Sequence, residues 1–464
     1  MLFMTSEPST SNTSTSNDNL KRVPTPPPGK LGKSELYAIA IGFVIGAGII
    51  TLIGPAVALT GASTWLAYFA AIVLGFLLIM PILFLTATLR LGGGYYSMIA
   101  GLAGIRPAGM YAVAFLVQPL LLSLFGLSLG VYLESLWPAL NVRYVGIASL
   151  TFFYIVNLLG IHWMAKVQKW MVVPLIGALL MFIIAGVPQI THTPFAFSSE
   201  NFFSGGAKGF MSAVYLFSYS TYGYALVMCC GKEAKNSTRD IPWSILMSIP
   251  TLIVLYCGVA IVATCVLPLE QVANKPLTYV AEEILSKPLF ILFIIGGPVM
   301  ALSTTMNANI AYFAIPIHQS CVDGWFPKSF ATKNRFGVPW KILTFIYLIG
   351  IIPLMLDYSI TTITRNMMLL NSTMSFLYSY AYYQLPKKYP EAWAKSKLHM
   401  PNPLYYAMVT ISLLAYITVF IDSIHSLTPT IVIVSLGAIA ICMAFGFVRS
   451  KSPDVEVETP MWDK

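Results

Sequence analysis

The sequence predicts an all-α integral membrane protein with twelve transmembrane helices. Hydrophobic residues make up 57% of the 464 residues and charged residues only 10%, whereas soluble domains carry about 25% charged residues. The apolar residues form runs that match the roughly 20 residues a spanning helix needs. The basic residues alternate between the connecting segments as the two sides of a membrane require.

The elements follow in chain order. Residues 1–33 are polar and rich in proline, and we expect a disordered cytoplasmic tail because such a stretch cannot bury a core. Twelve apolar runs then predict spans at residues 36–58, 64–89, 108–136, 144–163, 166–187, 207–230, 242–267, 288–315, 339–356, 366–385, 403–421 and 428–448. We divide them into a first unit of five spans (34–187), a second unit of five (207–385) and a final pair (401–449), followed by a cytoplasmic tail at 450–464.

The orientation of these spans is predicted from the 27 basic residues. With the N-terminus in the cytoplasm, the segments predicted outside hold only Arg143, Lys208, Lys275, Lys287 and Arg365. Cytoplasmic loops carry the excess of Lys and Arg in membrane proteins. We therefore expect a multi-pass protein of the cell membrane with both termini in the cytoplasm, and we read the net charge of +9 as topology rather than as a nucleic-acid surface.

The first span contains closely spaced glycines in the stretch IGFVIGAGIITLIGP, residues 41–55. Each glycine costs a helix about 1 kcal/mol relative to alanine, so two explanations are open. Gly42 and Gly46 have the spacing of small residues that pack helices closely. Alternatively, the helix is interrupted, and its free N–H and C=O groups line a polar cavity.

The sixth span favours the interruption. It contains FSYSTYGYA, residues 217–225, where small polar residues and a glycine replace the expected apolar ones. Interrupted helices at corresponding places of two halves indicate a transporter binding site. The sixth span comes five spans after the first. Because five is an odd number, the two units have opposite orientations in the membrane, as an inverted repeat requires.

Five motifs in order resemble those of the amino acid–polyamine–organocation (APC) superfamily of permeases. They are IGAGI (45–49), GGGYY (92–96), NLLGIHWMAKVQ (157–168), GKEAKNSTRDIP (231–242) and the stretch from TMNANIAYF to GVP (305–339). Ala47 stands where relatives often have Ser, and Ser237 where Pro is usual. The resemblance implies a LeuT-type 5+5 inverted repeat with broken helices 1 and 6 plus two C-terminal helices, and an amino acid or related amine as substrate.

The two breaks suit a zwitterion. The amides of Gly46, Ala47 and Gly48 precede a half-helix, and this positive end favours a carboxylate. Free carbonyl groups suit an ammonium group, and we expect them in both breaks, at Val44, Ile45, Tyr219, Ser220 and Thr221.

Side chains beside the breaks are expected to select the substrate. Tyr219 matches the family's aromatic gate, Tyr222 and Tyr224 lie near it, and Asn309 matches a position that faces substrate in relatives. Packing within the bundle is the alternative for each tyrosine. Asn307, Ser97 and Ser375 are further candidates, and Asn307 could equally form a structural hydrogen bond between helices.

Charged residues at the membrane centre are nearly missing from the sequence. Ala225 occupies the position where some arginine-handling relatives have Glu, and a cationic substrate would need a buried partner, so neutral amino acids are favoured. Glu233 and Arg239 are candidates for an inner-gate ion pair or for ordinary surface charges.

The coupling is left open between a proton, sodium and no ion. Thr304 and Thr305 could join first-span carbonyls in a sodium site, or bond to their own helix backbone. We expect no other metal site and no cofactor.

The sequence thus favours a secondary active amino acid transporter that works by alternating access, as symporter or exchanger. Two alternatives are a permease-like amino acid sensor and a transporter of polyamines or other organic amines. We do not expect an enzyme, since no His, Asp or Glu cluster lies within the spans, and the sequence does not decide the oligomeric state.

Overall fold

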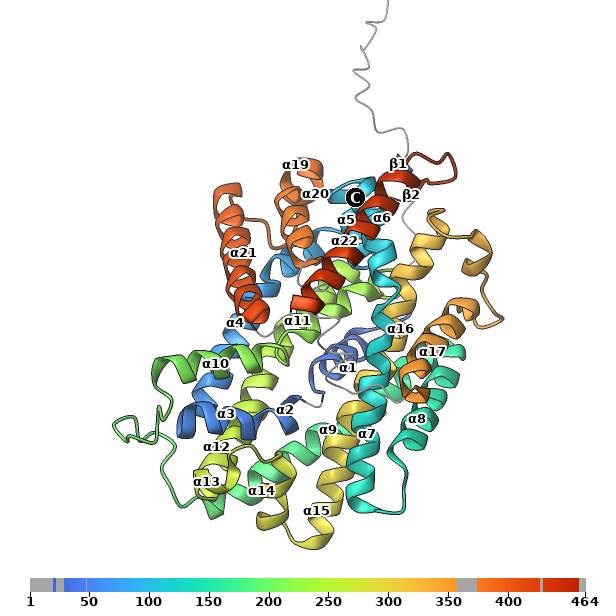
Figure 1. The fold of residues 1–464 in the computed structure, drawn as a ribbon. Coiled ribbons are helices and arrows are strands. Elements are labelled where there is room, and N and C mark those ends of the chain that lie inside the picture. The colour runs from blue at the N-terminus through green and yellow to red at the C-terminus, as the bar shows by residue number, and fades with distance from the viewer. Residues whose placement is uncertain (1–19, 22–28, 47, 357–373, 426–428, 459–464) are drawn as a thin grey trace, which may run out of the picture.

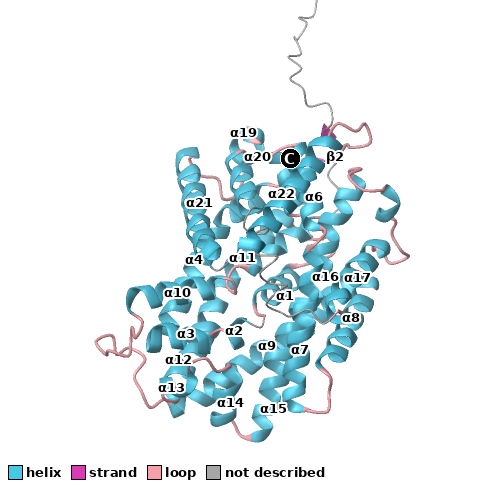
Figure 2. Cartoon of the chain, viewed as in Figure 1, coloured by secondary structure: helices cyan, strands magenta, loops and turns pink. Residues whose placement is uncertain are grey.

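The computed structural model describes residues 20–21, 29–46, 48–356, 374–425 and 429–458. Within these residues the chain is almost entirely helical, with one pair of two-residue strands (Figures 1 and 2). Helices satisfy their own backbone hydrogen bonds, which a lipid environment demands. The structure therefore agrees with a helical membrane protein.

The elements of the N-terminal half are β1 (Leu20–Lys21), α1 (Lys33–Val44), α2 (Gly48–Thr51), α3 (Ile53–Thr60), η1 (Gly61–Ser63), α4 (Thr64–Thr88), α5 (Tyr95–Leu102), α6 (Ile105–Phe115), η2 (Gln118–Leu120), α7 (Leu121–Leu136), α8 (Val142–Leu158), α9 (Ile161–Gly186), η3 (Val187–Gln189), α10 (Gly206–Ser218) and η4 (Gly223–Gly231). The elements of the C-terminal half are α11 (Ser237–Leu252), η5 (Ile253–Cys257), α12 (Gly258–Val266), α13 (Leu269–Val272), α14 (Leu277–Ile284), α15 (Lys287–Ile294), η6 (Ile295–Val299), α16 (Met300–Val322), η7 (Lys328–Ala331), α17 (Trp340–Met355), α19 (Leu385–Lys388), α20 (Pro390–Lys395), α21 (Asn402–His425), α22 (Pro429–Arg449) and β2 (Val457–Glu458).

Eight helical stretches among the described residues are long and apolar enough to cross a membrane. They are Lys33–Thr51, Ile53–Thr88, Ile105–Leu136, Ile161–Gln189, Ser237–Val266, Lys287–Val322, Asn402–Asp422 and Val432–Arg449. Two shorter apolar helices, α8 and α17, coincide with the predicted fourth and ninth spans. The predicted sixth span consists of α10 and η4. The tenth, predicted at residues 366–385, lies partly outside the described residues, and residues 374–383 of it are helical.

The outer helices expose large apolar side chains. Phe152, Ile184 and Val434 are examples, from α8, α9 and α22. Soluble monomers seldom expose wide apolar surfaces of this kind, so these faces fit contact with lipid.

Helix α1 lies near the centre of the bundle (Figure 1). It packs against α9, α11, α16 and η4, and its residues from Ala38 to Val44 are buried. The interruption that follows α1 is therefore placed in the middle of the molecule, away from the lipid-facing surface.

The two described ends of the chain meet on one face. Strand β1 pairs in parallel with β2, with Leu20 opposite Val457 and Lys21 opposite Glu458, and both strands lie beside the end of α22 (Figure 2). Chain ends on the same face require an even number of membrane crossings, and the predicted twelve spans meet this requirement. Which side of the membrane this face occupies stays a prediction.

Candidate substrate site at two helix breaks

The first predicted break is present in the structure. Helix α1 ends at Val44, and the amide of Ile45 donates the last helical hydrogen bond, 2.9 Å to the carbonyl of Ile41. Ile45 then leaves the helical region, with φ −83° and ψ 89°. The chain resumes as α2 at Gly48. Ala47, expected to contribute an amide, lies outside the described residues.

One amide of this break is already engaged. The N–H of Gly46 donates to the carbonyl of Val44 at 3.1 Å, closing a tight turn of three residues. We expected this amide to be unpaired and available to a carboxylate. The structure differs because the break folds into a turn that satisfies its own donor.

The second predicted break is also present. Helix α10 ends at Ser218, and the chain continues as the 3₁₀ segment η4 from Gly223. In between, the amides of Ser220 and Thr221 bond back to the carbonyls of Phe217 and Ser218, at 2.9 and 3.1 Å. Their hydroxyls bond to the same two carbonyls, and Thr221 Oγ1 also donates to Ala71 of α4 at 3.0 Å. Serine and threonine thus stabilise the interruption locally.

The two breaks touch each other through glycines. A Cβ atom at Gly48 would lie 2.6 Å from the Cβ of Ser220, and one at Gly223 would lie 2.5 Å from the carbonyl oxygen of Phe43. Both distances are too short for any side chain, so glycine permits the contact. Small residues allow such close approach of helix backbones in membranes. At Gly48, close packing and interruption of the helix therefore occur together.

A tyrosine that the sequence analysis did not single out joins the breaks. The hydroxyl of Tyr256 donates to the carbonyl of Val44 at 3.0 Å and to that of Ser220 at 3.4 Å. Tyr256 lies in the π-helical segment η5, one to two turns after Pro250. Proline removes a helical hydrogen bond, and π-helical turns often occur at functional sites.

Two further aromatic side chains pack beside this hydroxyl. The ring of Tyr68 stacks on Phe217 with centroids 3.6 Å apart, and it lies 4.9 Å from the ring of Tyr256. The hydroxyl of Tyr68 is 3.3 Å from Ser220 Oγ. The three rings of Tyr68, Phe217 and Tyr256 form one apolar wall next to the breaks, and the hydroxyl groups of the two tyrosines both contact Ser220.

The three predicted site tyrosines differ in their surroundings. Tyr219 is 61% exposed, Tyr222 is half-buried, and Tyr224 is fully buried. Among the described residues, the hydroxyl of Tyr224 has no hydrogen-bond partner. The ring of Tyr219 is exposed, and its role as an aromatic gate stays a prediction. Tyr224 is instead part of the core.

Helix α16 brings the predicted threonines to the first break. Thr305 Oγ1 donates to the carbonyls of Gly42, at 3.1 Å, and Ala301, at 2.9 Å. Thr304 Oγ1 bonds only to Ala301 among the contacts resolved here, at 2.9 Å. Asn309 donates to Thr305 of its own helix. Of these three residues, Thr305 is the one whose side chain forms a hydrogen bond to α1 among the described contacts.

Two of the family-like motifs meet in one buried network. Asn157 donates to the side chain of Asn307 at 3.1 Å, and Asn307 donates to Gln168 at 2.8 Å. Gln168 donates to the carbonyl of Thr304. A Cβ at Gly42 would collide with the amide nitrogen of Gln168. The alternative that Asn307 forms a structural bond between helices agrees with this geometry.

Four further predicted candidates lie on other segments: Ser97 in α5, Ser375 in the tenth predicted span, Glu233 between η4 and α11, and Arg239 in α11. Ser97 accepts a hydrogen bond from Gly93 within the GGGYY turn, and Ser375 has a side-chain contact with Tyr416. Arg239 is exposed and Glu233 half-buried. Neither of these two charged side chains forms an ion pair with another described residue. The neighbouring Lys232 does, 3.4 Å from Glu458.

A polar cluster that sequence reasoning missed lies where α16 ends. Asp323 accepts hydrogen bonds from Tyr96, at 2.6 Å, and from Gln319, at 2.8 Å. Gln319 also bonds to Lys232 and to Glu458 of β2. Burial raises the pKa of the Asp323 carboxyl to about 7, and the two hydrogen bonds oppose this shift.

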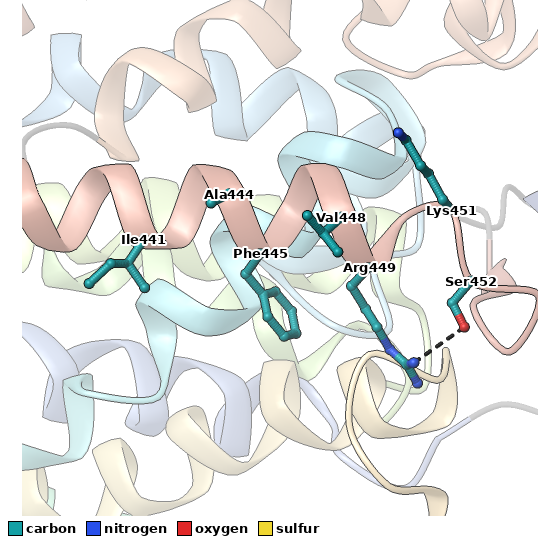
Figure 3. Close-up of a pocket in the computed structure, with 7 residues that line it drawn as sticks. All are labelled: Ile441, Ala444, Phe445, Val448, Arg449, Lys451 and Ser452. Carbon is teal, nitrogen blue, oxygen red and sulfur yellow. Dashed lines mark hydrogen bonds between the residues drawn. The ribbon is translucent and has the colours of Figure 1, made fainter.

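A surface pocket lies at the end of α22 (Figure 3). It is lined by Ile441, Ala444, Phe445, Val448, Arg449, Lys451 and Ser452. These residues come from one helix and the turn after it, and Arg449 bonds to Ser452 at 3.2 Å. The lining offers cations and apolar groups but no carboxylate for an ammonium group, so it does not suit a zwitterion.

Comparison with known proteins identifies the family. The model of the amino acid permease family matches residues 31–460, nearly the whole chain. The chain belongs to this family. The family-like motifs therefore reflect membership, and the permease is a multi-pass membrane protein related to transporters.

Individual relatives of the permease are distant. It is 23% identical over 460 residues to the D-serine/D-alanine/glycine transporter of Escherichia coli, covering 91% of this chain and 94% of that protein. It is 21% identical over 349 residues to an uncharacterised amino acid permease of Bacillus subtilis, covering 70% and 73%. It is 24% identical over 316 residues to an uncharacterised protein of Methanocaldococcus jannaschii, covering 66% and 72%.

Proposed function

We propose that this permease is a secondary active transporter that moves neutral, zwitterionic amino acids across the cell membrane by alternating access. The contact between the two helix breaks at the centre of the bundle carries this proposal. Backbone carbonyls of both breaks, at Val44 and Ser220, face one point, where an ammonium group could bind. Carbonyl groups at broken helices coordinate substrates and ions in other transporters.

The neutral-substrate proposal rests on the residues at the breaks. Those that form or contact them carry no formal charge in the described part of the chain, whereas a cationic side chain would need a buried acid. The D-serine/D-alanine/glycine transporter covers almost the full length of the permease. Small amino acids, including the D-enantiomers, are therefore the first substrates to test.

The proposed architecture is a LeuT-type arrangement of twelve helices, with inverted units at 34–187 and 207–385 and two further helices at 401–449. Breaks in the first and sixth spans support it, since the two breaks lie against each other as an inverted repeat would place them. Both chain ends on one face support an even number of spans.

The coupling ion is proposed as proton or sodium. In favour of sodium, Thr305 Oγ1 and the carbonyl of Gly42 lie 3.1 Å apart beside the first break, and hard oxygen atoms are the ligands that such a cation prefers. Thr304 bonds within its own helix, which weakens its candidacy as a ligand.

Uptake into proteoliposomes tests the proposed function. Labelled glycine, alanine, serine and a polyamine are offered with a sodium gradient, a proton gradient, internal substrate or none of these. We expect amino acid uptake that one gradient or internal substrate accelerates. Binding without uptake would favour the amino acid sensor, and uptake of the polyamine alone would favour the amine transporter.

A substitution locates the site. Gly48→Leu is expected to abolish amino acid uptake, because its side chain would occupy the space beside Ser220. Gly177→Leu is the matched control, since a side chain at Gly177 of α9 meets nothing within 4 Å. Unchanged uptake by the Gly48 variant would show that the breaks are not the site.

A further inference from the structure

The hydroxyl of Tyr256 is the feature that connects the two broken helices. It carries one proton and shares it between two carbonyl oxygens, that of Val44 at 3.0 Å and that of Ser220 at 3.4 Å. Val44 is the last residue of α1, and Ser220 follows the end of α10. Tyr256 itself is fully buried.

The two carbonyls need such a donor when the site is empty. A carbonyl group at a helix break has no partner four residues further on, and an unpaired carbonyl at membrane depth is costly. Val44 also accepts the N–H of Gly46, but for Ser220 the Tyr256 hydroxyl is the one donor resolved in the described structure.

The position of this hydroxyl is built into its helix. Tyr256 lies in the π-helical turn η5, after Pro250, and a π-turn shifts a side chain relative to the α-helical register. The ring is held by Tyr68, at a centroid distance of 4.9 Å, and Tyr68 is held in turn by Phe217. The hydroxyl therefore reaches both breaks from a fixed position.

A substrate ammonium group would form stronger hydrogen bonds to the two carbonyls than the Tyr256 hydroxyl does. It has three N–H donors and a positive charge, and charge-assisted hydrogen bonds are about twice as strong as neutral ones. One hydroxyl proton divided between two acceptors makes at most one good bond. Each carbonyl oxygen has two lone pairs. Those of Val44 are both engaged, by the Gly46 N–H and the Tyr256 hydroxyl, so an ammonium group that binds Val44 takes the place of the hydroxyl.

We propose that Tyr256 is a positioning residue that holds the two breaks together in the empty carrier, and that the substrate ammonium takes over this bridge on binding. The proposal rests on the proposed transport function. Net uptake and exchange should therefore depend on Tyr256 to different degrees. Net uptake requires the empty carrier to return through a state in which the breaks meet without substrate, whereas exchange of internal for external substrate always passes through the loaded state.

The test is Tyr256→Phe, which keeps the ring and removes the donor. The variant leaves buried carbonyl acceptors without their donor, so we expect net uptake to fall about tenfold while exchange stays within about twofold of wild type. The melting temperature of the empty protein falls, and the rise on adding amino acid becomes larger than in wild type, because substrate restores the missing bridge.

Tyr405→Phe is the matched control. Tyr405 is equally buried and donates to a backbone carbonyl, that of Tyr382 at 3.0 Å, away from the breaks. This variant is expected to lower the melting temperature while leaving the effect of substrate on it, and the ratio of uptake to exchange, unchanged.

Two results would overturn the role of Tyr256 while leaving transport intact. One is an equal loss of uptake and exchange in Tyr256→Phe, and the other is unchanged uptake. A wild-type protein that shows neither uptake nor exchange would instead contradict the proposed function. In that case a larger melting-temperature rise in Tyr256→Phe than in wild type still supports the bridge, and a smaller or equal rise rejects it.

Discussion

Gly223 shows how a single missing side chain allows the two breaks to meet. It begins η4, and an added Cβ would lie 2.5 Å from the carbonyl oxygen of Phe43 and 3.2 Å from the Cα of Val44. Because both neighbours are backbone atoms, they cannot move aside without displacing α1. We expect Gly223→Ala to lower the free energy of unfolding by about 1–3 kcal/mol, measured by thermal unfolding in detergent.

The control for this prediction is Gly177→Ala. Gly177 lies on the exposed side of α9, where an added Cβ meets nothing within 4 Å. Alanine favours a helix over glycine by about 1 kcal/mol, so this variant should be neutral or slightly more stable. Equal destabilisation of both variants would contradict the close contact at Gly223.

At the residue scale the sequence predicted the backbone of the site better than its side chains. Glycines and a run of small polar residues are unusual in a lipid-facing helix, so both breaks could be located. Tyr256 could not, because it lies in an ordinary apolar run of a chain with 25 tyrosines. A π-turn also changes which residues share a face, and no sequence period reports it.

At the scale of elements, the network of Asn157, Asn307 and Gln168 ties α8, α9 and α16 together. Asn307 donates to Gln168 Oε1 and to the carbonyl of Met164, and its Oδ1 accepts from Asn157. Asn307→Ala leaves buried partners unsatisfied, so we expect a loss of about 2–4 kcal/mol in the free energy of unfolding. Thermal unfolding in detergent measures it.

Asn309→Ala provides the comparison within the same helix. Its side-chain amide bonds only to Thr305 of α16 among the contacts resolved here, so the variant should lose about 1 kcal/mol or less. If Asn309→Ala proved as damaging as Asn307→Ala, the bonds between helices would not be what stabilises this region.

The helices themselves were largely predictable, because long apolar runs leave the backbone no alternative in a membrane. The predicted sixth span is one element whose helix type could not be predicted in this way. Its second half is the 3₁₀ segment η4 rather than an α-helix. Gly223, at the start of η4, packs against the backbone of α1, and the path of the chain there is fitted to that helix. The hydrophobic pattern alone reports burial and does not distinguish these two helix types.

At the scale of the whole molecule, the two ends of the chain close over the end of α16. Val455 and Val457 are fully buried, Glu456 N–H donates to the carbonyl of Asp323, and Glu458 pairs with Lys232. The sequence predicted only a cytoplasmic tail at residues 450–464. This packing could not be predicted, because the partners are spread over distant parts of the chain.

This closure predicts a dependence on pH. Around Asp323 lie Tyr96 of α5, Gln319 of α16, Lys232 after η4 and Glu458 of β2. Burial raises the pKa of Asp323 from 3.8 to about 7 in the folded protein. The folded state therefore binds this proton more tightly than the unfolded state does. The stabilisation that results is complete below the unfolded pKa of 3.8 and is lost as the pH rises through about 7.

We therefore expect the free energy of unfolding to fall by about 2 kcal/mol between about pH 5 and about pH 8. Residues 450–458 should also lose protection against hydrogen exchange at the higher pH, once the rates are corrected for the faster intrinsic exchange of amides there. Asp323→Asn cannot ionise and should remove most of this dependence. Asp454→Asn, at an exposed carboxylate paired with Arg449, should retain it. A full decline in the Asp323 variant would show that another group controls the closure, because an uncharged side chain at this position cannot be expelled by ionisation.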